Sequence, residues 1–351
     1  MQSQRHYVSF DGLRGVVATA VMATHGWILL GFVTLPRGYL GVDFFFLLSG
    51  FVIAHSYQER LAADMTAGVF ARTRFARLFP MIALGALMGG AVMMLTGGVA
   101  SPLLLGGMLA QMLTLPAPFA SGSGDFLWPI NPPSWSLFWE VLANAAFALG
   151  LFRFNSHTWL RLAAISMLSL GIVAVTVSTI ELGYTQSSFL VGIPRTLLPF
   201  SIGVLLWRIR QSGKLPRASP SIPLSALAVV LAACFALPGK SGLVDLALVA
   251  LVFPLVLMLA LSSRHTSPIW SLAGRISYPL YLVHYPLLNL LVAMQPAATS
   301  LPGRWVWYFS FIFGSLVIGL VVNKVYDEPV RQWLAHRLIV QRRSVKVGAF
   351  I

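Results

Sequence analysis

FDGLRGVVATAVMATHGWILLGFV, residues 10–33, decides the fold, because an apolar stretch of this length is a candidate transmembrane helix. The stretch nevertheless contains Asp11 and Arg14 at its start and His25 deep inside. Ionisable residues within a membrane span are costly, so they are candidates for function. Ten residues separate Arg14 from His25, and the helical rise places the two roughly 16 Å apart.

The composition of the whole chain is that of a polytopic membrane protein. Of its 351 residues, 57% are hydrophobic and 10% are charged, whereas soluble domains carry about 25% charged residues. The formal net charge of +14 would suggest nucleic acid in a soluble protein. We instead attribute it to Lys and Arg in cytoplasmic loops and expect no nucleic-acid partner. The single cysteine and the scattered histidines predict neither a disulfide framework nor a metal site.

Hydrophobic runs recur along the chain. They cover residues 10–33, 39–57, 80–97, 102–116, 134–152, 159–178, 189–207, 223–237, 243–262, 276–294 and 305–325. The charged stretch 58–79 predicts an amphipathic interfacial helix after the second span. No cleavable signal peptide is evident, and the first run is expected to stay as a signal anchor.

The basic loops decide the predicted topology. If residues 80–116 cross the membrane an odd number of times, all the basic segments face the cytoplasm. These segments are residues 72–77, 153–161, 208–217, 264–275 and the tail. We therefore predict an all-α bundle of about ten transmembrane helices in the inner (cytoplasmic) cell membrane, with both termini cytoplasmic. One run within 80–116 would be re-entrant, or both would form one long broken helix. Residues 7–335 would form a single domain, followed by a basic cytoplasmic tail, 336–351.

In this topology three ionisable residues are expected in the outer part of the membrane. His25 lies roughly 20 Å into a core of about 30 Å. The span starting at Ser134 enters from the outer side, which places Glu140 at a similar depth, and Asp43 is also on the outer side. A neutral histidine can accept and return a hydroxyl proton, and a carboxylate can orient its ring. This favours His25 as general base with Glu140 and Asp43 as catalytic carboxylates, over a purely structural histidine.

The arginines near the inner face permit two interpretations. Arg72, Arg74 and Arg77 suit a polyphosphate, because guanidinium binds phosphate in bidentate fashion. A positive-inside signal explains them equally well. Asp11 and Arg14 share a helix face, so they either pair at the membrane edge or contribute to the site.

Polar groups near the middle of two later spans are weaker candidates. His284 lies in SYPLYLVHYP, where a structural histidine is at least as well supported as a catalytic one. A negatively charged reaction intermediate needs a hydrogen-bond donor. Ser136, Tyr281 and His284 are the candidates for that role.

The motifs DGLRG…H, GVDFFFLLSGF, RTRFARLFP, PPSWSLFWE, SYPLYLVHYP and YDEPVR occur in this order and together resemble the membrane acyltransferase 3 family over about residues 7–335. The resemblance implies a membrane enzyme that moves an acyl group, usually acetyl, from cytoplasmic acyl-CoA to a hydroxyl. Arg14 and His25 match the family's arginine–histidine signature, in which the histidine is catalytic. The arginines before Pro80 match its donor-side motif. Glu140 matches the first acidic position of a motif that often has two, whereas SLFWEV has one.

These pieces suggest a mechanism. Acyl-CoA would serve as donor substrate, bound by Arg72, Arg74, Arg77 and Arg14, with its thioester reaching His25; no permanently bound cofactor is expected. The acceptor, a saccharide or lipid-linked glycan, would enter from the outer side and be acylated directly or through an acyl-histidine. The alternative is a transporter or flippase of a glycolipid, whose buried charges would bind substrate or protons. A non-catalytic scaffold fits poorly, because it has no need of buried ionisable residues.

Overall fold

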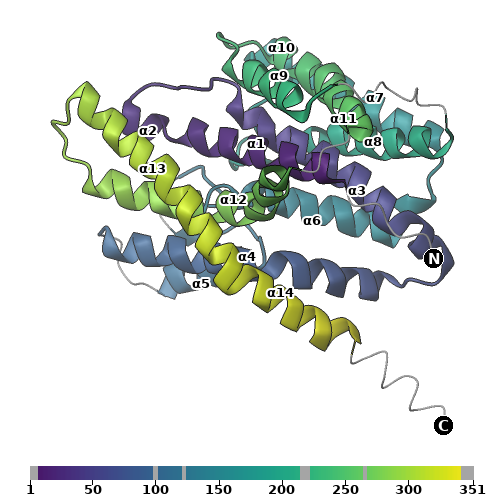
Figure 1. Cartoon of the computed structure of the whole chain (residues 1–351), viewed down its shortest axis with the longest axis horizontal. Coiled ribbons are helices and arrows are strands. Elements are labelled where there is room, and N and C mark those ends of the chain that lie inside the picture. The colour runs from purple at the N-terminus through teal and green to yellow at the C-terminus, as the bar shows by residue number, and fades with distance from the viewer. Residues whose placement is uncertain (1–6, 98–101, 121–123, 214–221, 264–266, 341–351) are drawn as a thin grey trace.

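The computed structural model describes residues 7–97, 102–120, 124–213, 222–263 and 267–340, and these ranges form helices and no named strand. Eight helical segments of the described chain are long and apolar enough to cross a membrane. They lie mainly along the long axis of an elongated bundle (Figure 1). The predicted all-α, polytopic membrane architecture is therefore confirmed.

The helices follow the predicted hydrophobic runs. They are α1 (Val8–His25), α2 (Trp27–Leu30), α3 (Gly41–Ala63), α4 (Ala67–Leu95), α5 (Pro102–Met112), α6 (Ser134–Leu149), α7 (Ser156–Val177), α8 (Gly192–Gln211), α9 (Leu224–Ala236), α10 (Gly242–Ala247), α11 (Phe253–Ser262), α12 (Pro268–Met294), α13 (Leu301–Val322) and α14 (Glu328–Ala335). Of the predicted tail 336–351, only 336–340 lies within the described residues, and it continues the helical path of α14.

Helix α1 lies in the middle of the bundle, against α12, α9 and α3 (Figure 1). It runs parallel to α12, because Gly274 lies against Asp11 near the start of α1 and His284 lies against His25 at its end. A Cβ atom on Gly15 would come within 2.5 Å of Ala273, so the two backbones approach very closely. Small residues of this kind permit such contacts between membrane helices.

The separate interfacial helix predicted for residues 58–79 is not formed. Residues 58–63 extend α3, and α4 begins at Ala67 and continues without a break through Pro80 to Leu95. Thr66 caps its start by accepting a hydrogen bond from the N–H of Val69 at 3.3 Å. The arginines at positions 72, 74 and 77 therefore lie on the first turns of a long helix that enters the bundle. The charge density of this segment indicated a surface helix, but the helix buries one side.

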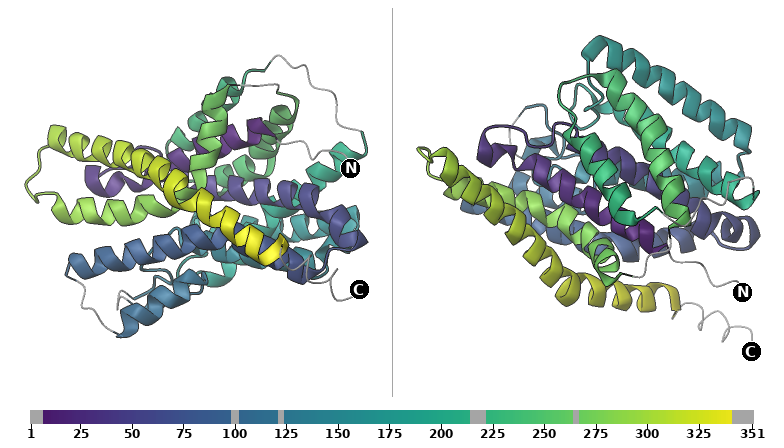
Figure 2. Two further views of the ribbon diagram at one scale, coloured as in Figure 1. Left: turned by 60° about the horizontal axis from the view of Figure 1, so that its bottom comes forward. Right: turned by 45° about the horizontal axis from the view of Figure 1, so that its top comes forward.

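Helices α5 and α6 lie one after the other along α4. The contacts along α4, taken from its end to its start, are Gly90 with Met108, Gly89 with Ile130, Gly85 with Asn131 and Arg74 with Glu140. Figure 2 shows α4 and α5 side by side, with α13 and α14 running obliquely across the bundle. The 11-residue α5 is thus the predicted re-entrant element, and α6 begins inside the bundle rather than at its edge.

A proline in α12 provides the anchor for the segment between α5 and α6. Pro286 has no N–H to donate, which leaves the carbonyl oxygen of Leu282 without its helical partner. The side-chain amide of Asn131 donates to this oxygen at 2.9 Å, and Asn131 is fully buried. Gln111, also buried, accepts from the N–H of Asn131 at 3.1 Å. Polar contacts therefore hold irregular backbone within the protein, as the membrane interior requires.

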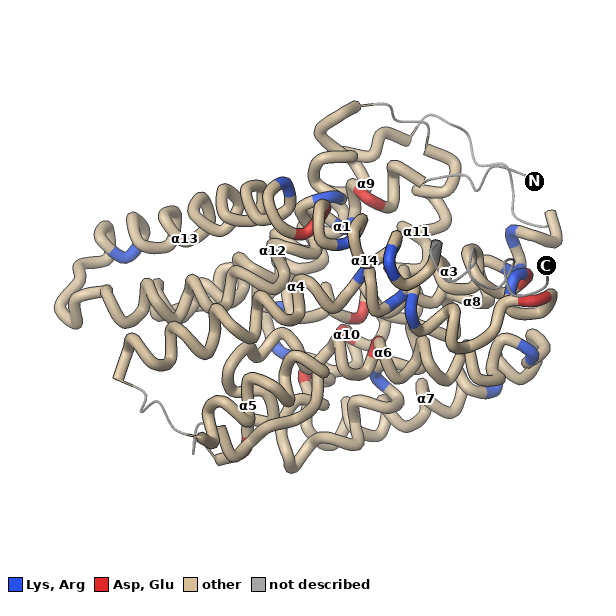
Figure 3. The backbone as a smooth tube through the Cα atoms, turned by 90° about the horizontal axis from the view of Figure 1, so that it is seen from below, with Lys and Arg blue, Asp and Glu red and all other residues tan. Residues whose placement is uncertain are grey.

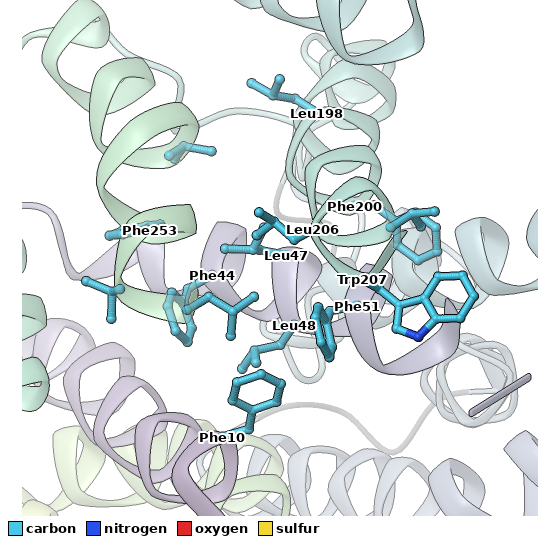
Figure 4. Packing of buried hydrophobic residues seen from close by; sticks show 14 of the residues in the cluster. Phe10, Phe44, Leu47, Leu48, Phe51, Leu198, Phe200, Leu206, Trp207 and Phe253 are labelled. Carbon is cyan, nitrogen blue, oxygen red and sulfur yellow. The ribbon is translucent and has the colours of Figure 1, made fainter. Parts of the chain in front are cut away.

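The largest buried cluster packs α3 against α8, α1 and α11 (Figure 4). Its members include Phe10, Phe44, Leu47, Leu48, Phe51, Phe200, Trp207 and Phe253. Two glycines allow the backbones of α3 and α8 to touch. A Cβ atom on Gly50 would come within 2.1 Å of the Phe200 carbonyl oxygen, and one on Gly203 within 2.2 Å of the Leu47 oxygen.

We expect Gly50→Val to destabilise the protein by about 1–3 kcal/mol, because the added side chain forces α3 away from α8. Thermal unfolding in detergent measures the change. Gly171→Val on α7 is the matched control, since the nearest atom to its Cβ position is 4.0 Å away. Equal melting temperatures for the two variants would contradict the close contact.

Charged residues are unevenly distributed along the bundle. Figure 3 shows most of them in one half, whereas the tube along the start of α13 and the end of α12 is almost free of them. We call the end that holds the first turns of α4 and the start of α1 the basic end. The opposite end, where α1 stops at His25, is the far end.

Candidate active site

Two histidine side chains meet where α1 ends. His25 Nδ1 lies 3.1 Å from Nε2 of His284, which is fully buried in the middle of α12. The rings are nearly parallel, with 26° between their planes and 5.1 Å between their centroids. Tyr285 packs its edge against His25 at a centroid distance of 5.3 Å. The ring of His25 is thus fixed by two aromatic neighbours from a single helix.

A cavity of about 420 Å³ leads from the basic end toward this pair. Along α12 it is lined by Ser271, Gly274, Arg275, Ser277, Tyr278 and Tyr281. Most of these positions recur every three or four residues, so they form one face of the helix. From Ser271 to Tyr281 this face extends about 15 Å. His284 is on the next turn of the same face, so the cavity stops one helical turn short of the histidine pair.

Arginine side chains line the basic end of the cavity. Of the predicted residues, Arg14, Arg74 and Arg77 contribute, together with Asp11. Asp11 and Arg14 form the predicted pair within α1, with 3.6 Å between carboxylate and guanidinium. Arg72 does not line the cavity; its Nε donates to the carbonyl oxygen of Gly68 at 3.1 Å. Three of the four predicted donor-binding arginines therefore share one cavity.

Arg275 and Arg331 also line the cavity and were missed from the sequence. The predicted span began at residue 276, which left Arg275 in a basic loop. Helix α12 in fact begins at Pro268, so Arg275 shares a face with Tyr278 and Tyr281. Extending the three-to-four-residue periodicity back from Tyr281 would have found it.

Glu140 lies nearer the basic end than predicted. Its Oε1 accepts from Arg74 Nη2 and from Ser49 Oγ, each at 3.1 Å. Ser136, one turn earlier in α6, contacts Tyr281, and His284 is one turn further along α12. By the helical rise, Glu140 is then about 10 Å from the level of His284. The expected match in depth with His25 is wrong, because α6 starts inside the bundle and not at the membrane edge.

Asp43 is engaged in a buried ion pair with Arg195 of α8. Its two carboxylate oxygens accept from Nε and Nη2 at 3.2 and 3.0 Å, and both side chains are 1% exposed. Arg195 also donates to the carbonyl oxygen of Leu182 at 2.7 Å. Asp43 does not line the cavity, and the hydrogen bonds of its carboxylate come from Arg195. The expectation that a carboxylate orients His25 is thus not met within the described residues; His284 occupies that place.

Ser136 and Tyr281 meet at the inner limit of the cavity. Their hydroxyl oxygens are 2.8 Å apart, and each hydroxyl is also within 3.2 Å of the carbonyl oxygen of Pro133. Both side chains line the cavity and are buried. The structure therefore brings together two of the three candidate donors, and the third, His284, lies beside them on the next turn.

We expect Glu140→Gln to lower the KM for an anionic donor about two- to fivefold and to leave kcat within about threefold. Removing the carboxylate frees the Arg74 guanidinium to bind the anionic donor, because the largely buried ion pair, whose side chains are 10% and 18% exposed, is lost. Initial rates against donor concentration measure both constants. If kcat instead fell about 100-fold at unchanged KM, the result would support the catalytic role that the sequence suggested for Glu140.

Residues 7–324 match the family model that describes an acyltransferase domain. This match covers nearly the whole chain. The protein belongs to the acyltransferase 3 family. It is an O-acyltransferase that passes through the membrane several times, and the resemblance drawn from the sequence motifs is confirmed.

Other acyltransferase 3 relatives agree with this assignment. The exopolysaccharide production protein ExoZ of Rhizobium meliloti (strain 1021) is 28% identical over 301 residues, covering 84% of this chain and 89% of ExoZ. Protein 2 in the picA locus of Rhizobium radiobacter is 34% identical over 156 residues, 40% of this chain and 81% of that protein. The acyltransferase MdmB of Streptomyces mycarofaciens is 32% identical over 162 residues, 40% of this chain and 38% of MdmB. The chain has no match among solved structures.

Proposed function

We propose that this acyltransferase 3 protein moves an acyl group, acetyl in the simplest case, from cytoplasmic acyl-CoA to a hydroxyl group of a saccharide, with His25 as general base. One observation carries the proposal. A single cavity joins a group of arginines at the basic end to Tyr281, one turn from the partner of His25.

The basic end fits the anionic part of the donor. Arg14, Arg74, Arg77 and Arg275 line the same cavity, and guanidinium groups bind phosphates in bidentate fashion. The positive-inside rule assigns this end to the cytoplasm, where acyl-CoA is available. The pantetheine arm of the donor is long and nearly uncharged, so it suits the part of the cavity that follows α12 from Ser271 to Tyr281. The thioester would then arrive near Tyr281 and the two histidines.

The far end fits the acceptor. His25 is only partly buried as a residue, and in this proposal the acceptor hydroxyl approaches its ring from the far end. The relative ExoZ is described by its name as an exopolysaccharide production protein, which supports a saccharide acceptor. In this proposal the acceptor is a saccharide or a lipid-linked glycan at the outer surface of the membrane.

The proposed reaction balances without any further reactant. His25 removes the proton of the acceptor hydroxyl as its oxygen attacks the thioester carbonyl carbon. The negative charge that develops on the carbonyl oxygen needs a donor, and Tyr281 and Ser136 are the nearest hydroxyls that line the cavity. The carbon–sulfur bond then breaks, and the imidazolium of His25 returns its proton to the CoA thiolate. The products are an O-acyl saccharide and CoA.

Purified protein in detergent, radiolabelled acetyl-CoA and a panel of glycan acceptors test the proposal. Transfer of label to a glycan without a membrane gradient is the expected result, because the chemistry needs no gradient. A transporter or flippase of a glycolipid is the competing function. Tight glycolipid binding with neither acetyl-CoA binding nor turnover would overturn the acyltransferase mechanism and favour transport.

A further inference from the structure

The hydrogen bonds of His284 determine which of its ring nitrogens carries the proton. His284 Nδ1 lies 3.0 Å from the carbonyl oxygen of Leu280, one turn earlier in α12. A carbonyl oxygen can only accept a hydrogen bond, so Nδ1 must donate and carries a proton. Within the part of the chain that the structure describes, no carboxylate bonds to either histidine ring, and an unpaired buried charge is very costly. The resting His284 is therefore neutral, and its Nε2 has a free lone pair.

The proton position on His25 follows from that of His284. Nε2 of His284 is an acceptor, and its partner at 3.1 Å is Nδ1 of His25, which donates in this pair. The ring of His25 also hydrogen-bonds to the backbone of Val21, so His284 is its side-chain partner in addition to that backbone group. The neutral His25 then carries its proton on Nδ1. Its other nitrogen, Nε2, is left unprotonated and can act as a base.

We propose that His284 is the positioning residue that holds His25 in the tautomer with a basic Nε2. The tautomer itself does not depend on the proposed function; only the use of Nε2 as the base in acyl transfer rests on it. In serine hydrolases a carboxylate has the same task toward the catalytic histidine. A neutral histidine performs it here without leaving a net negative charge within the membrane, where such a charge is expensive. When His25 takes up the acceptor's proton, its Nδ1–H still donates to His284, so the ring keeps its orientation.

Nitrogen NMR of the full-length protein in lipid nanodiscs tests the tautomer directly. The protein is labelled with ¹⁵N-histidine, and the signals of His25 and His284 are assigned with His25→Gln and His284→Gln. In the wild type at neutral pH we expect Nδ1 of His25 to be protonated and Nε2 to be unprotonated. A wild-type His25 with its proton on Nε2 would overturn the proposal. This measurement uses no substrate, so it is independent of whether the proposed reaction occurs.

Kinetics of two replacements separate positioning from simple packing. His284→Leu fills the space but cannot accept a hydrogen bond, so kcat should fall about tenfold or more with the donor KM unchanged. His284→Gln offers a side-chain oxygen as acceptor and should recover most of the loss. His157→Gln, at an exposed position on α7, is the control.

Equal losses in the two His284 variants, with the wild-type tautomer of His25 retained in both, would overturn the positioning role. If His284→Leu fails to fold, the wild-type spectrum and the His284→Gln variant still decide the question. An inactive wild type with the expected tautomer would contradict the proposed reaction and leave the positioning role intact.

Discussion

His25→Ala is expected to lower kcat for acyl transfer by at least about 100-fold, since a positioned general base contributes about 10²–10⁴-fold. The substitution removes the atom that we propose takes the acceptor's proton. It should leave donor binding unchanged, because Arg14 lies about 16 Å from His25 along α1, and the other arginines line the same cavity as Arg14. Single-turnover transfer from radiolabelled acetyl-CoA measures the chemical step, and equilibrium binding of desulfo-CoA measures the donor site.

His157→Ala provides the matched control for this prediction, because His157 is exposed at the start of α7 and far along the chain from the site. Its kcat should equal that of the wild type. Retained transfer by His25→Ala in correctly folded protein would rule out His25 as the base. Loss of both transfer and donor binding would instead indicate a damaged fold, which size-exclusion chromatography and thermal unfolding would detect.

The double variant Arg14→Ala/Arg77→Ala is expected to raise the KM for acyl-CoA by about 100-fold or more. Both guanidinium groups line the same cavity. Each hydrogen bond to a charged group contributes about 1.5–3 kcal/mol, and each 1.4 kcal/mol corresponds to about tenfold in affinity. The value of kcat at saturating donor should change little, because neither side chain approaches the histidine pair. Saturation curves at low and high ionic strength measure the effect and its dependence on charge.

Arg72→Ala is the internal control for the donor site. Arg72 belongs to the same sequence motif as Arg77, but it bonds to the backbone of its own helix and does not line the cavity. Its donor KM should stay within about threefold of the wild-type value. If Arg72→Ala raises the KM as strongly as the double variant, the donor binds outside the cavity. Arg74 is less informative as a test, because its removal also deprives Glu140 of a partner.

The sequence predicted those features that depend on one helix at a time. Hydrophobic length located nearly every membrane helix, and the spacing of Arg14 and His25 correctly placed the two residues well apart on α1. Contacts between two helices could not be predicted from the pattern of a single helix. The partner of His25 could be inferred only as a residue type, and the depth argument selected a carboxylate. The structure provides His284, because α1 and α12 run parallel and in contact.

The error in the position of Glu140 has a physical origin. Depth was counted from Ser134 as though that residue lay at the membrane edge. The amide of Asn131 bonds instead to a carbonyl oxygen that Pro286 frees in the middle of α12, which moves the start of α6 into the bundle. The sequence shows that Pro286 leaves the carbonyl oxygen of Leu282 without a helical hydrogen bond, but it does not show which group will donate to that oxygen. Arg275 was missed for the opposite reason, because the charge at the start of α12 concealed the length of that helix.

The segment that contains α5 and α6 also constrains the order in which the protein is assembled during synthesis. Helices α5 and α6 have 11 and 16 residues, and lengths of about 16 and 24 Å are too short to cross a core of about 30 Å alone. The amide of Asn131 finds its acceptor 151 residues later in the chain. Until α12 has been synthesised and has entered the membrane, the amide of Asn131 has no carbonyl oxygen of Leu282 to bond to. A buried amide without a partner is costly. Asn131 and Leu282 therefore cannot make this contact before α12 is in place, and the contact of His284 with His25 has the same requirement.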